Sequence, residues 1–256
     1  LDAPAGALDA TLVALSDVPR DGLGKALRQA KRRVALMTGL ADLAGAWPLD
    51  VVMARLTDLG GLACDLAIRA ELGEQLRRGK LPAPVREDAA GAGGLFVLAM
   101  GKMGAHELNY SSDIDLICLF DGSLYGDADV LDARQALVRV TRNMSTLLSE
   151  RTSDGYVFRT DLRLRPDPSV TPVCISMEAA ETYYESFGRT WERAAMIKAR
   201  PAAGDLAAGR RFLEDIRPFI WRRHLDFAAI EDAHAIRLRI RDSKRLHGRV
   251  EAVALA

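Results

Sequence analysis

The spacing of the hydrophobic residues changes once along this chain, and that change limits the folds open to it. From residue 22 to residue 79, apolar side chains recur at the spacing of amphipathic helices, and the dipeptide Trp47-Pro48 divides them into two long helices. The next stretch, KLPAPVREDAAGAGG at residues 80–94, is too rich in Pro, Ala and Gly to form a regular element. We therefore place an internal boundary there.

After this boundary the pattern becomes that of short strands mixed with helices. The predicted elements are strands at 95–100 and 113–120 with a loop or helix start between them, a helix at 127–151, an extended segment at 156–165, a short return strand at 173–175, and helices from 177 onward. This order predicts an α+β protein with a small mixed sheet. We divide it into an amino-terminal helical region (1–92), a core (93–202) and a carboxy-terminal helical region (203–256).

The composition is that of an ordinary globular protein and favours no charged partner. The 256 residues include 35 Lys and Arg against 35 Asp and Glu, so nothing draws the whole chain to nucleic acid or to a membrane. The apolar runs are too short to cross a bilayer, and the three separated cysteines suit a reducing compartment. We expect a cytoplasmic protein. The lack of an initiating Met and the abrupt end EAVALA suggest a fragment of a longer chain.

An acidic pair opens the second predicted strand, within GKMGAHELNYSSDIDLICLF at residues 101–120. Because residues i and i+2 share one face of a strand, Asp113 and Asp115 project together while Ile114 and Leu116 point into the core. Two carboxylates at a fixed separation provide the hard oxygen ligands that Mg²⁺ prefers. A pair alone is a weak signal, because charged residues at a strand end are commonly just solvated.

A third carboxylate comes with arginines in the segment RTDLRLR, residues 159–165. Alternation along an extended chain puts Asp161, Arg163 and Arg165 on one face, with the leucines on the other. Carboxylates that hold cations, beside arginines that bind non-bridging oxygens, suit metal-bound phosphates, and we expect Arg163 or Arg165 to hold a phosphate. The alternative is a salt-bridged sheet surface, which we rank lower because the arginines outnumber their local acid.

The loop before the acidic pair offers further contacts to phosphate. Gly101 has no Cβ, so its backbone can approach a ligand closely, while Lys102 is either a phosphate ligand or a solvated loop lysine. Ser112 either joins the ligand set or, as we favour, steadies the loop through hydroxyl–backbone bonds. Neither a P-loop motif nor GxGxxG occurs in the chain, which argues against Walker-type ATPases and Rossmann domains.

Three segments, in this order, resemble one family: GKMGAHELNYSSDIDLICLF, YVFRTDLRLRP and YYESFGRTWERAAMIKAR. They are similar to the nucleotidyltransferase domain of bacterial glutamine synthetase adenylyltransferases, two-headed enzymes of the DNA polymerase beta-like superfamily. The upstream segment RQAKRR, residues 28–33, also resembles that family. The wording WERAAMIKAR, residues 191–200, is closer to the amino-terminal, adenylyl-removing copy of the domain.

The resemblance implies a DNA polymerase beta-like core that acts on glutamine synthetase with Mg²⁺, or Mn²⁺, as cofactor. The implied reaction is phosphorolytic removal of AMP from an adenylylated tyrosine to give ADP, and the alternative is ATP-dependent adenylylation of the same tyrosine. Asp113, Asp115 and Asp161 then become the catalytic, metal-binding carboxylates. Gly101 and Lys102 stand where the superfamily usually has Gly-Ser. The family also implies a PII-type signalling protein as regulator of the full-length enzyme.

Three other functions share parts of this pattern. A glycosyltransferase also uses Asp-x-Asp to hold a metal-bound nucleotide sugar, but within a larger α/β domain with more strands before the motif. A phosphatase would use Asp113 as a nucleophile and pass through an aspartyl-phosphate. A catalytically silent binding module would keep the carboxylates for structure alone. The four histidines show no paired metal-ligand spacing, so a histidine metal site has little support.

Overall fold

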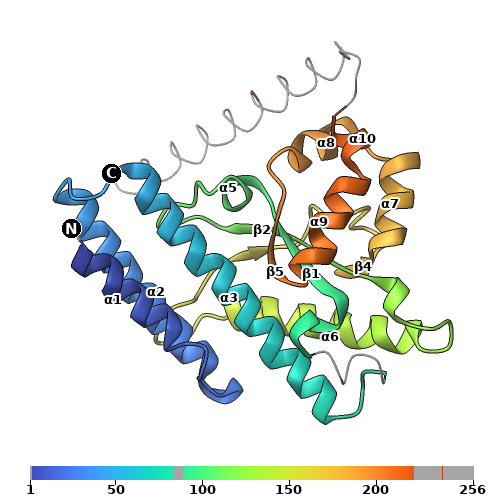
Figure 1. Cartoon of the computed structure of the whole chain (residues 1–256), viewed down its shortest axis with the longest axis horizontal. Coiled ribbons are helices and arrows are strands. Elements are labelled where there is room, and N and C mark those ends of the chain that lie inside the picture. The colour runs from blue at the N-terminus through green and yellow to red at the C-terminus, as the bar shows by residue number, and fades with distance from the viewer. Residues whose placement is uncertain (1, 83–88, 222–237, 239–256) are drawn as a thin grey trace, which may run out of the picture.

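A computed structural model describes residues 2–82, 89–221 and 238. It shows a small mixed sheet enclosed by helices (Figure 1), which confirms the predicted α+β class. The helices are α1 (Asp2–Val13), α2 (Arg20–Leu43), α3 (Leu49–Arg77), η1 (Ala89–Gly94), α5 (Gly101–Gly104), η2 (Gly122–Leu124), α6 (Val130–Ser149), α7 (Met177–Ser186), α8 (Thr190–Met196), α9 (Leu206–Asp215) and α10 (Arg217–Ile220). The strands are β1 (Leu95–Ala99), β2 (Ile114–Phe120), β3 (Thr160–Asp161), β4 (Cys174–Ser176) and β5 (Arg200–Gly204). Apart from residue 238, the predicted helical region beyond residue 221 lies outside the described residues.

The strands form one sheet in the order β3-β2-β1-β5, and β4 also pairs with β2. β1 is antiparallel to β2 and to β5, whereas β2 is parallel to β3 and to β4. β3 pairs with the first residues of β2 and β4 with its last, so both share one edge of β2. The start of β2 is therefore the place where the segment around β3 enters the sheet.

The strand β5 is a correction to the prediction of helices throughout the region after residue 177. Its sequence, RPAAG, contains no β-branched or aromatic residue, so the local pattern gave no strand signal. β1 is buried along its whole length, and its backbone groups need hydrogen-bond partners on both edges. β2 occupies one edge and β5 supplies the other. This tertiary requirement outweighs the weak strand propensity of the segment.

The two long helices predicted at residues 22–79 are confirmed as α2 and α3. α2 ends where Gly45 adopts a φ of 62°, and the Gly45 amide donates to the carbonyl oxygen of Asp42 at 2.9 Å. Pro48 then stands directly before α3, where its missing N–H breaks no helical hydrogen bond. No helix in the described ranges, these two included, is long and apolar enough to cross a membrane.

The sheet lies between two hydrophobic clusters. Side chains of β1 alternate between them: Val97 joins the cluster that contains α2, α3 and α6, and Leu98 joins the one that contains α7, α9 and α10. The first cluster runs without a break from α1 to the sheet, so α1, α2 and α3 cover one face of the core. It also contains all three cysteines, Cys64, Cys118 and Cys174, as buried free thiols.

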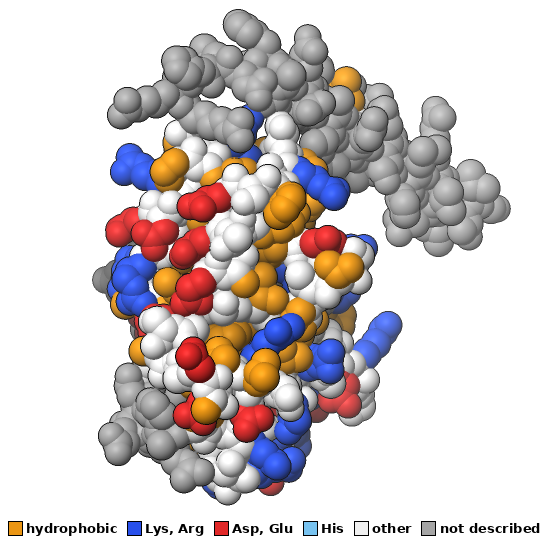
Figure 2. Space-filling model, turned by 90° about the vertical axis from the view of Figure 1, so that its right-hand side faces the viewer, with side chains coloured by type: hydrophobic (Ala, Val, Ile, Leu, Met, Phe, Trp, Pro, Cys, Tyr) orange, Lys and Arg blue, Asp and Glu red, His pale blue; other side chains and the backbone are white. Residues whose placement is uncertain are grey.

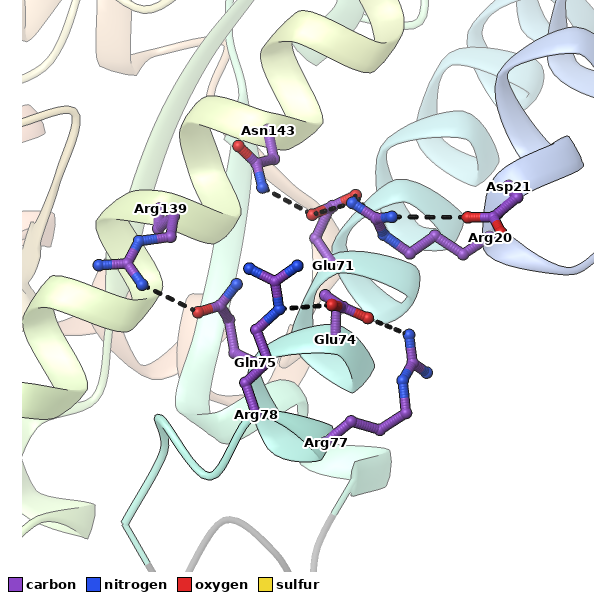
Figure 3. Close-up of polar contacts among 9 residues, drawn as sticks. All are labelled: Arg20, Asp21, Glu71, Glu74, Gln75, Arg77, Arg78, Arg139 and Asn143. Carbon is purple, nitrogen blue, oxygen red and sulfur yellow. Dashed lines mark hydrogen bonds and ion pairs between the residues drawn. The ribbon is translucent and has the colours of Figure 1, made fainter.

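A buried carboxylate joins α3 to α2 and α6 (Figure 3). Glu71 of α3 is 3% exposed and accepts hydrogen bonds from Arg20 Nε at 2.9 Å and Arg20 Nη2 at 3.2 Å. Its second oxygen also accepts from Asn143 Nδ2 of α6 at 2.7 Å. Both oxygens are thus paired, which a buried carboxylate requires. The ion pairs of Glu74 in the same figure involve exposed arginines.

Candidate functional site

Three acidic residues meet where β2 begins, beside β3. The short helix α5 contacts β2 (Figure 1). Asp113 directly precedes β2, and Asp115 is the second residue of that strand. The parallel pairing sets Asp115 opposite Asp161 of β3, and in-register neighbours of a parallel pair project to the same face of the sheet. The structure therefore brings together the three acidic residues that the sequence analysis singled out.

Crowded negative charge marks the centre of this group. Burial raises the pKa of Asp115, and the carboxylates of Asp161 and Asp113 raise it further. Each of these causes disfavours the charged form of the Asp115 side chain. A half-buried carboxylate with two acidic neighbours is a place where a cation would be bound favourably.

Gly101 explains how closely α5 approaches Asp115. Its φ of 53° lies in the left-handed region, and a Cβ at this position would stand 3.0 Å from Oδ2 of Asp115. The amide of Met100 donates to the Asp115 carbonyl oxygen at 2.9 Å, which fixes the approach. Backbone rather than side chain therefore borders the Asp115 carboxylate on this side.

Two arginines neutralise the outer carboxylates. Arg159 Nε donates to Oδ1 of Asp113 in a short contact. Arg163 donates through its backbone amide to Oδ1 of Asp161 at 2.8 Å, and its Nε lies 3.0 Å from each oxygen of that carboxylate. The hydrogen bond from the Arg163 side chain is the largest cause that lowers the pKa of Asp161. Asp161 is thus held as an anion beside Asp115.

The donor chemistry of this group fits a divalent cation such as Mg²⁺ or Mn²⁺, which prefers carboxylate oxygens. Within the described residues, no three His, Cys, Asp or Glu side chains stand as a ready-made metal-binding set. Asp113 and Asp161 each form an ion pair with an arginine, Arg159 and Arg163 respectively. A cation bound by all three carboxylates would compete with these arginines. The backbone bordering Asp115 at Gly101 leaves that side free of a competing side chain.

Lys102 lies within α5, and Ser112 lies on the segment that connects α5 to β2. Lys102 is exposed on α5. The Ser112 hydroxyl accepts from the Asn109 amide at 3.1 Å and donates to Oδ1 of Asn109 at 2.7 Å. These bonds close the loop in front of the acidic pair, in line with the loop-steadying role that the sequence analysis favoured for Ser112.

The extended face predicted for residues 159–165 is wrong beyond Asp161. The strand stops after two residues and the chain turns at residues 163–164, so Arg165 does not share a face with Asp161 and Arg163. Its guanidinium instead donates to the carbonyl oxygens of its own loop: Leu162 at 2.8 Å, Pro168 at 2.9 Å and Thr171 at 3.0 Å. Arg165 thus shapes the loop after β3.

Arg159 is the residue at this site that the sequence analysis left without a role. Besides Asp113, it contacts the carbonyl oxygen of Ser111 through Nη2 at 3.0 Å and the hydroxyl of Tyr156 through Nη1 at 2.7 Å. The signal was present in the sequence, because Arg159 and Asp161 are two apart in a segment predicted to be extended. The pattern alone does not say which arginine of residues 159–165 pairs with Asp113.

A hollow of about 480 Å³ lies at the end of β2 farther from the carboxylates, between the start of α6, β4 and α7. Its walls are mostly hydrophobic and include the exposed side chains of Leu131, Val170 and Phe187. Figure 2 views the molecule from the side of α7, where hydrophobic side chains lie among acidic ones. Phe120, the last residue of β2, lines this hollow, so the length of the strand separates it from Asp115.

Comparison with known proteins gives consistent results. A family model described as glutamate-ammonia ligase adenylyltransferase matches residues 1–215. The chain is 54% identical over 208 residues to a protein of a Bradyrhizobium species, 51% over 214 residues to one of Rhodopseudomonas palustris, and 47% over 233 residues to one of Mesorhizobium japonicum. Each of these relatives is named a bifunctional glutamine synthetase adenylyltransferase/adenylyl-removing enzyme.

These matches cover most of this chain but a small part of each relative. They take in 81%, 84% and 91% of the chain, and 21%, 22% and 24% of the respective relatives. The chain thus spans about a fifth to a quarter of the length of the curated relatives it matches.

Proposed function

Because the chain belongs to the glutamate-ammonia ligase adenylyltransferase family, we propose that it is a metal-dependent nucleotidyltransferase unit acting on glutamine synthetase. The single observation that carries the proposal is the parallel register of β2 and β3, which sets Asp161 opposite Asp115, two residues along the chain from Asp113. We take the core to be DNA polymerase beta-like, since a carboxylate pair on one strand and a third acid on its neighbour suit that superfamily.

The roles of the residues follow from their places. Asp113, Asp115 and Asp161 would hold Mg²⁺ or Mn²⁺, which when bound neutralises charge on the phosphoryl oxygens. The backbone at Gly101 would lie along the nucleotide phosphate, with Lys102 at its outer side. Arg163 would bind a non-bridging oxygen once Asp161 turns to the cation. In this proposal Ser112 keeps the loop closed and does not touch the ligand.

We further propose that the reaction is removal of AMP from an adenylylated tyrosine. An oxygen of inorganic phosphate attacks the phosphorus of the AMP group, the bond from phosphorus to the tyrosine oxygen breaks, and the products are ADP and the free tyrosine. The leaving phenolate has a conjugate acid of pKa ~10, so it needs less help from a general acid than an alkoxide would. The main barrier is the approach of two anions, which arginines and a divalent cation lower.

The wording WERAAMIKAR at residues 191–200, similar to the adenylyl-removing copy of the domain, supports this direction over ATP-dependent adenylylation. The expected protein substrate is glutamine synthetase, with phosphate as co-substrate and ADP as product. A PII-type protein would regulate the full-length enzyme. We place this chemistry in the cytoplasm, where the three free cysteines would stay reduced.

The test is to incubate the purified chain and Mg²⁺ with adenylylated glutamine synthetase plus phosphate, and separately with unmodified glutamine synthetase plus ATP. We expect ADP release in the first reaction only. Asp113→Asn and Asp115→Asn should each abolish that release while the circular dichroism spectrum is unchanged. Asp132→Asn, at an exposed position on α6, is the matched control and should keep the wild-type rate. AMP incorporation in the second reaction would reverse the proposed direction, and activity that persists in both site variants would refute the site.

A further inference from the structure

We propose that Arg159 is a displaceable counter-ion, which neutralises Asp113 when no divalent cation is bound and turns to the phosphate of the substrate when a cation takes its place. This inference rests on the proposed function, because it assumes that the three carboxylates bind a divalent cation. It assigns a binding role to a residue that the sequence analysis left without one.

The ion pair between Arg159 and Asp113 is weak enough for a bound cation to replace it. Both side chains are about half exposed, 53% for Arg159 and 54% for Asp113, and exposed ion pairs contribute little to stability. The cation that would replace the arginine meets three carboxylates instead of one. Exchange of the arginine for a divalent cation at Asp113 is therefore favourable, and it frees a guanidinium next to the reaction centre.

Tyr156 keeps the freed guanidinium close to the site. The Arg159 guanidinium lies over the Tyr156 ring, 5.4 Å from its centroid, and also donates to the Tyr156 hydroxyl. Lys31 of α2 lies 4.3 Å from the centroid of the same ring and 5.0 Å from that of Phe158, which holds the aromatic pair against the helix. Arg159 can therefore lose its bond to Asp113 and remain anchored at its other end.

The two neighbouring arginines are held differently. Arg165 donates to three carbonyl oxygens of its own loop, so moving it would dismantle the turn after β3. Arg163 contacts Asp161 through both its backbone amide and its side chain, so the backbone contact to Asp161 remains even when the side chain turns to a ligand. Arg159 contacts Asp113 through a side-chain nitrogen alone, and its one bond to a backbone carbonyl is to Ser111 at 3.0 Å. The planar fork of an arginine that is held at one end suits a phosphate oxygen pair.

The experiment measures two affinities of the full chain: Mn²⁺ binding by electron paramagnetic resonance, and ADP binding at saturating Mn²⁺ by calorimetry. The variants are Arg159→Gln and Arg159→Lys. The matched control is Arg55→Gln, because Arg55 forms an ion pair with Asp9, at an N···O distance of 3.2 Å, that does not involve the three carboxylates. We expect Arg159→Gln to bind Mn²⁺ about threefold to tenfold tighter, because a competing cation is lost, and to bind ADP about tenfold more weakly. Arg159→Lys should fall between, and Arg55→Gln should match the wild type in both affinities.

The opposite movement of the two affinities is the signature of the proposal. Equal Mn²⁺ affinity in the wild type and Arg159→Gln would overturn the counter-ion role while leaving the proposed function intact. Tighter Mn²⁺ binding with unchanged ADP affinity would overturn the contact with phosphate. If the wild type and Asp115→Asn bound Mn²⁺ equally, the carboxylates would not be the cation site, and the proposed function would fail together with this inference.

Discussion

At the scale of single residues, the site depends on one position where a side chain would intrude. Gly101 has a left-handed backbone, and a Cβ added to it would lie 3.0 Å from Oδ2 of Asp115. An L-residue there would be strained, and its Cβ would press on the oxygen that we propose as a cation ligand. The geometry of the acidic group is thus set partly by a residue that carries no functional group.

We therefore expect Gly101→Ala to lower the free energy of unfolding by about 1–2 kcal/mol, from the strained backbone, and to weaken Mn²⁺ binding about tenfold by shifting Asp115. Thermal denaturation and a Mn²⁺ titration measure the two effects. Gly39→Ala is the control: it lies within α2, its Cβ would come no closer than 3.9 Å to Tyr110, and alanine favours a helix. Wild-type Mn²⁺ affinity in Gly101→Ala would contradict the importance of this contact.

The acidic residues could be predicted from the sequence, but the arrangement of the arginines could not. The rule that i and i+2 share a strand face needs only local information, and it placed Asp113 and Asp115 together correctly. Extending the same rule from Asp161 to Arg165 failed, because the length of β3 is decided by what pairs with it. β3 ends after it pairs with Asp115, and further along the same edge β2 pairs with β4 from Cys118 onward.

At the scale of secondary-structure elements, the shortest strand has the largest consequence. β3 consists of Thr160 and Asp161 alone, and two residues of pairing hold it against β2. A hydrogen bond of 2.5 Å between the hydroxyls of Thr160 and Ser145 ties it to α6 as well. The position of Asp161 therefore depends on a helix that carries none of the proposed catalytic residues.

Ser145→Ala should loosen β3 and so reduce catalysis. We expect the free energy of unfolding to fall by about 1 kcal/mol, the usual worth of one hydrogen bond, and the rate of ADP release to fall severalfold. Faster hydrogen exchange at the Ile114 amide, which donates to the Arg159 carbonyl oxygen at 2.9 Å, would localise the change. The control is Ser149→Ala, whose hydroxyl bonds a carbonyl of its own helix at 2.6 Å. An equal loss of activity in both variants would argue against a specific role for Ser145.

The long helices, the central strands and β4 were predictable at this scale, whereas β5 was not. The periodicity of residues 22–79 and the apolar run at β1 carry strong local signals, and both are confirmed. β5 carries none, since Pro, Ala and Gly gain strand structure only from the unpaired edge of β1. α1 lies in the amino-terminal region predicted to be helical, although no separate helix was predicted at residues 2–13.

At the scale of the whole molecule, the helices before residue 82 and the sheet share a single hydrophobic cluster. The predicted division at residues 92 and 202 stays a prediction, but the apolar side chains of α1–α3 do not form a separate core from those on one face of the sheet. Glu71 of α3 adds a polar connection between helices, because it accepts hydrogen bonds from Arg20 of α2 and from Asn143 of α6 (Figure 3).

Breaking this connection should destabilise the whole fold. Arg20→Met leaves the buried Glu71 carboxylate with Asn143 as its remaining partner among those shown in Figure 3. We expect the free energy of unfolding to fall by about 2 kcal/mol. This value is at the lower end for a broken buried ion pair, because Arg20 is partly exposed. The melting temperature should fall by about 4–8 °C. Arg77→Met, which removes an exposed partner of Glu74, should leave it within about 1 °C. Similar shifts in the two variants would show that Glu71 does not join the helices energetically.

Because Cys64, Cys118 and Cys174 are buried, the rate at which they react with a thiol reagent measures how often the interior opens. A thiol reagent such as a maleimide or an aromatic disulfide reaches these sulfurs only when the interior opens, so the speed of native labelling reports how often the chain visits open states. A cysteine placed on the surface would react long before them. Fluorescent probes can therefore be attached at chosen surface points without first removing the natural thiols.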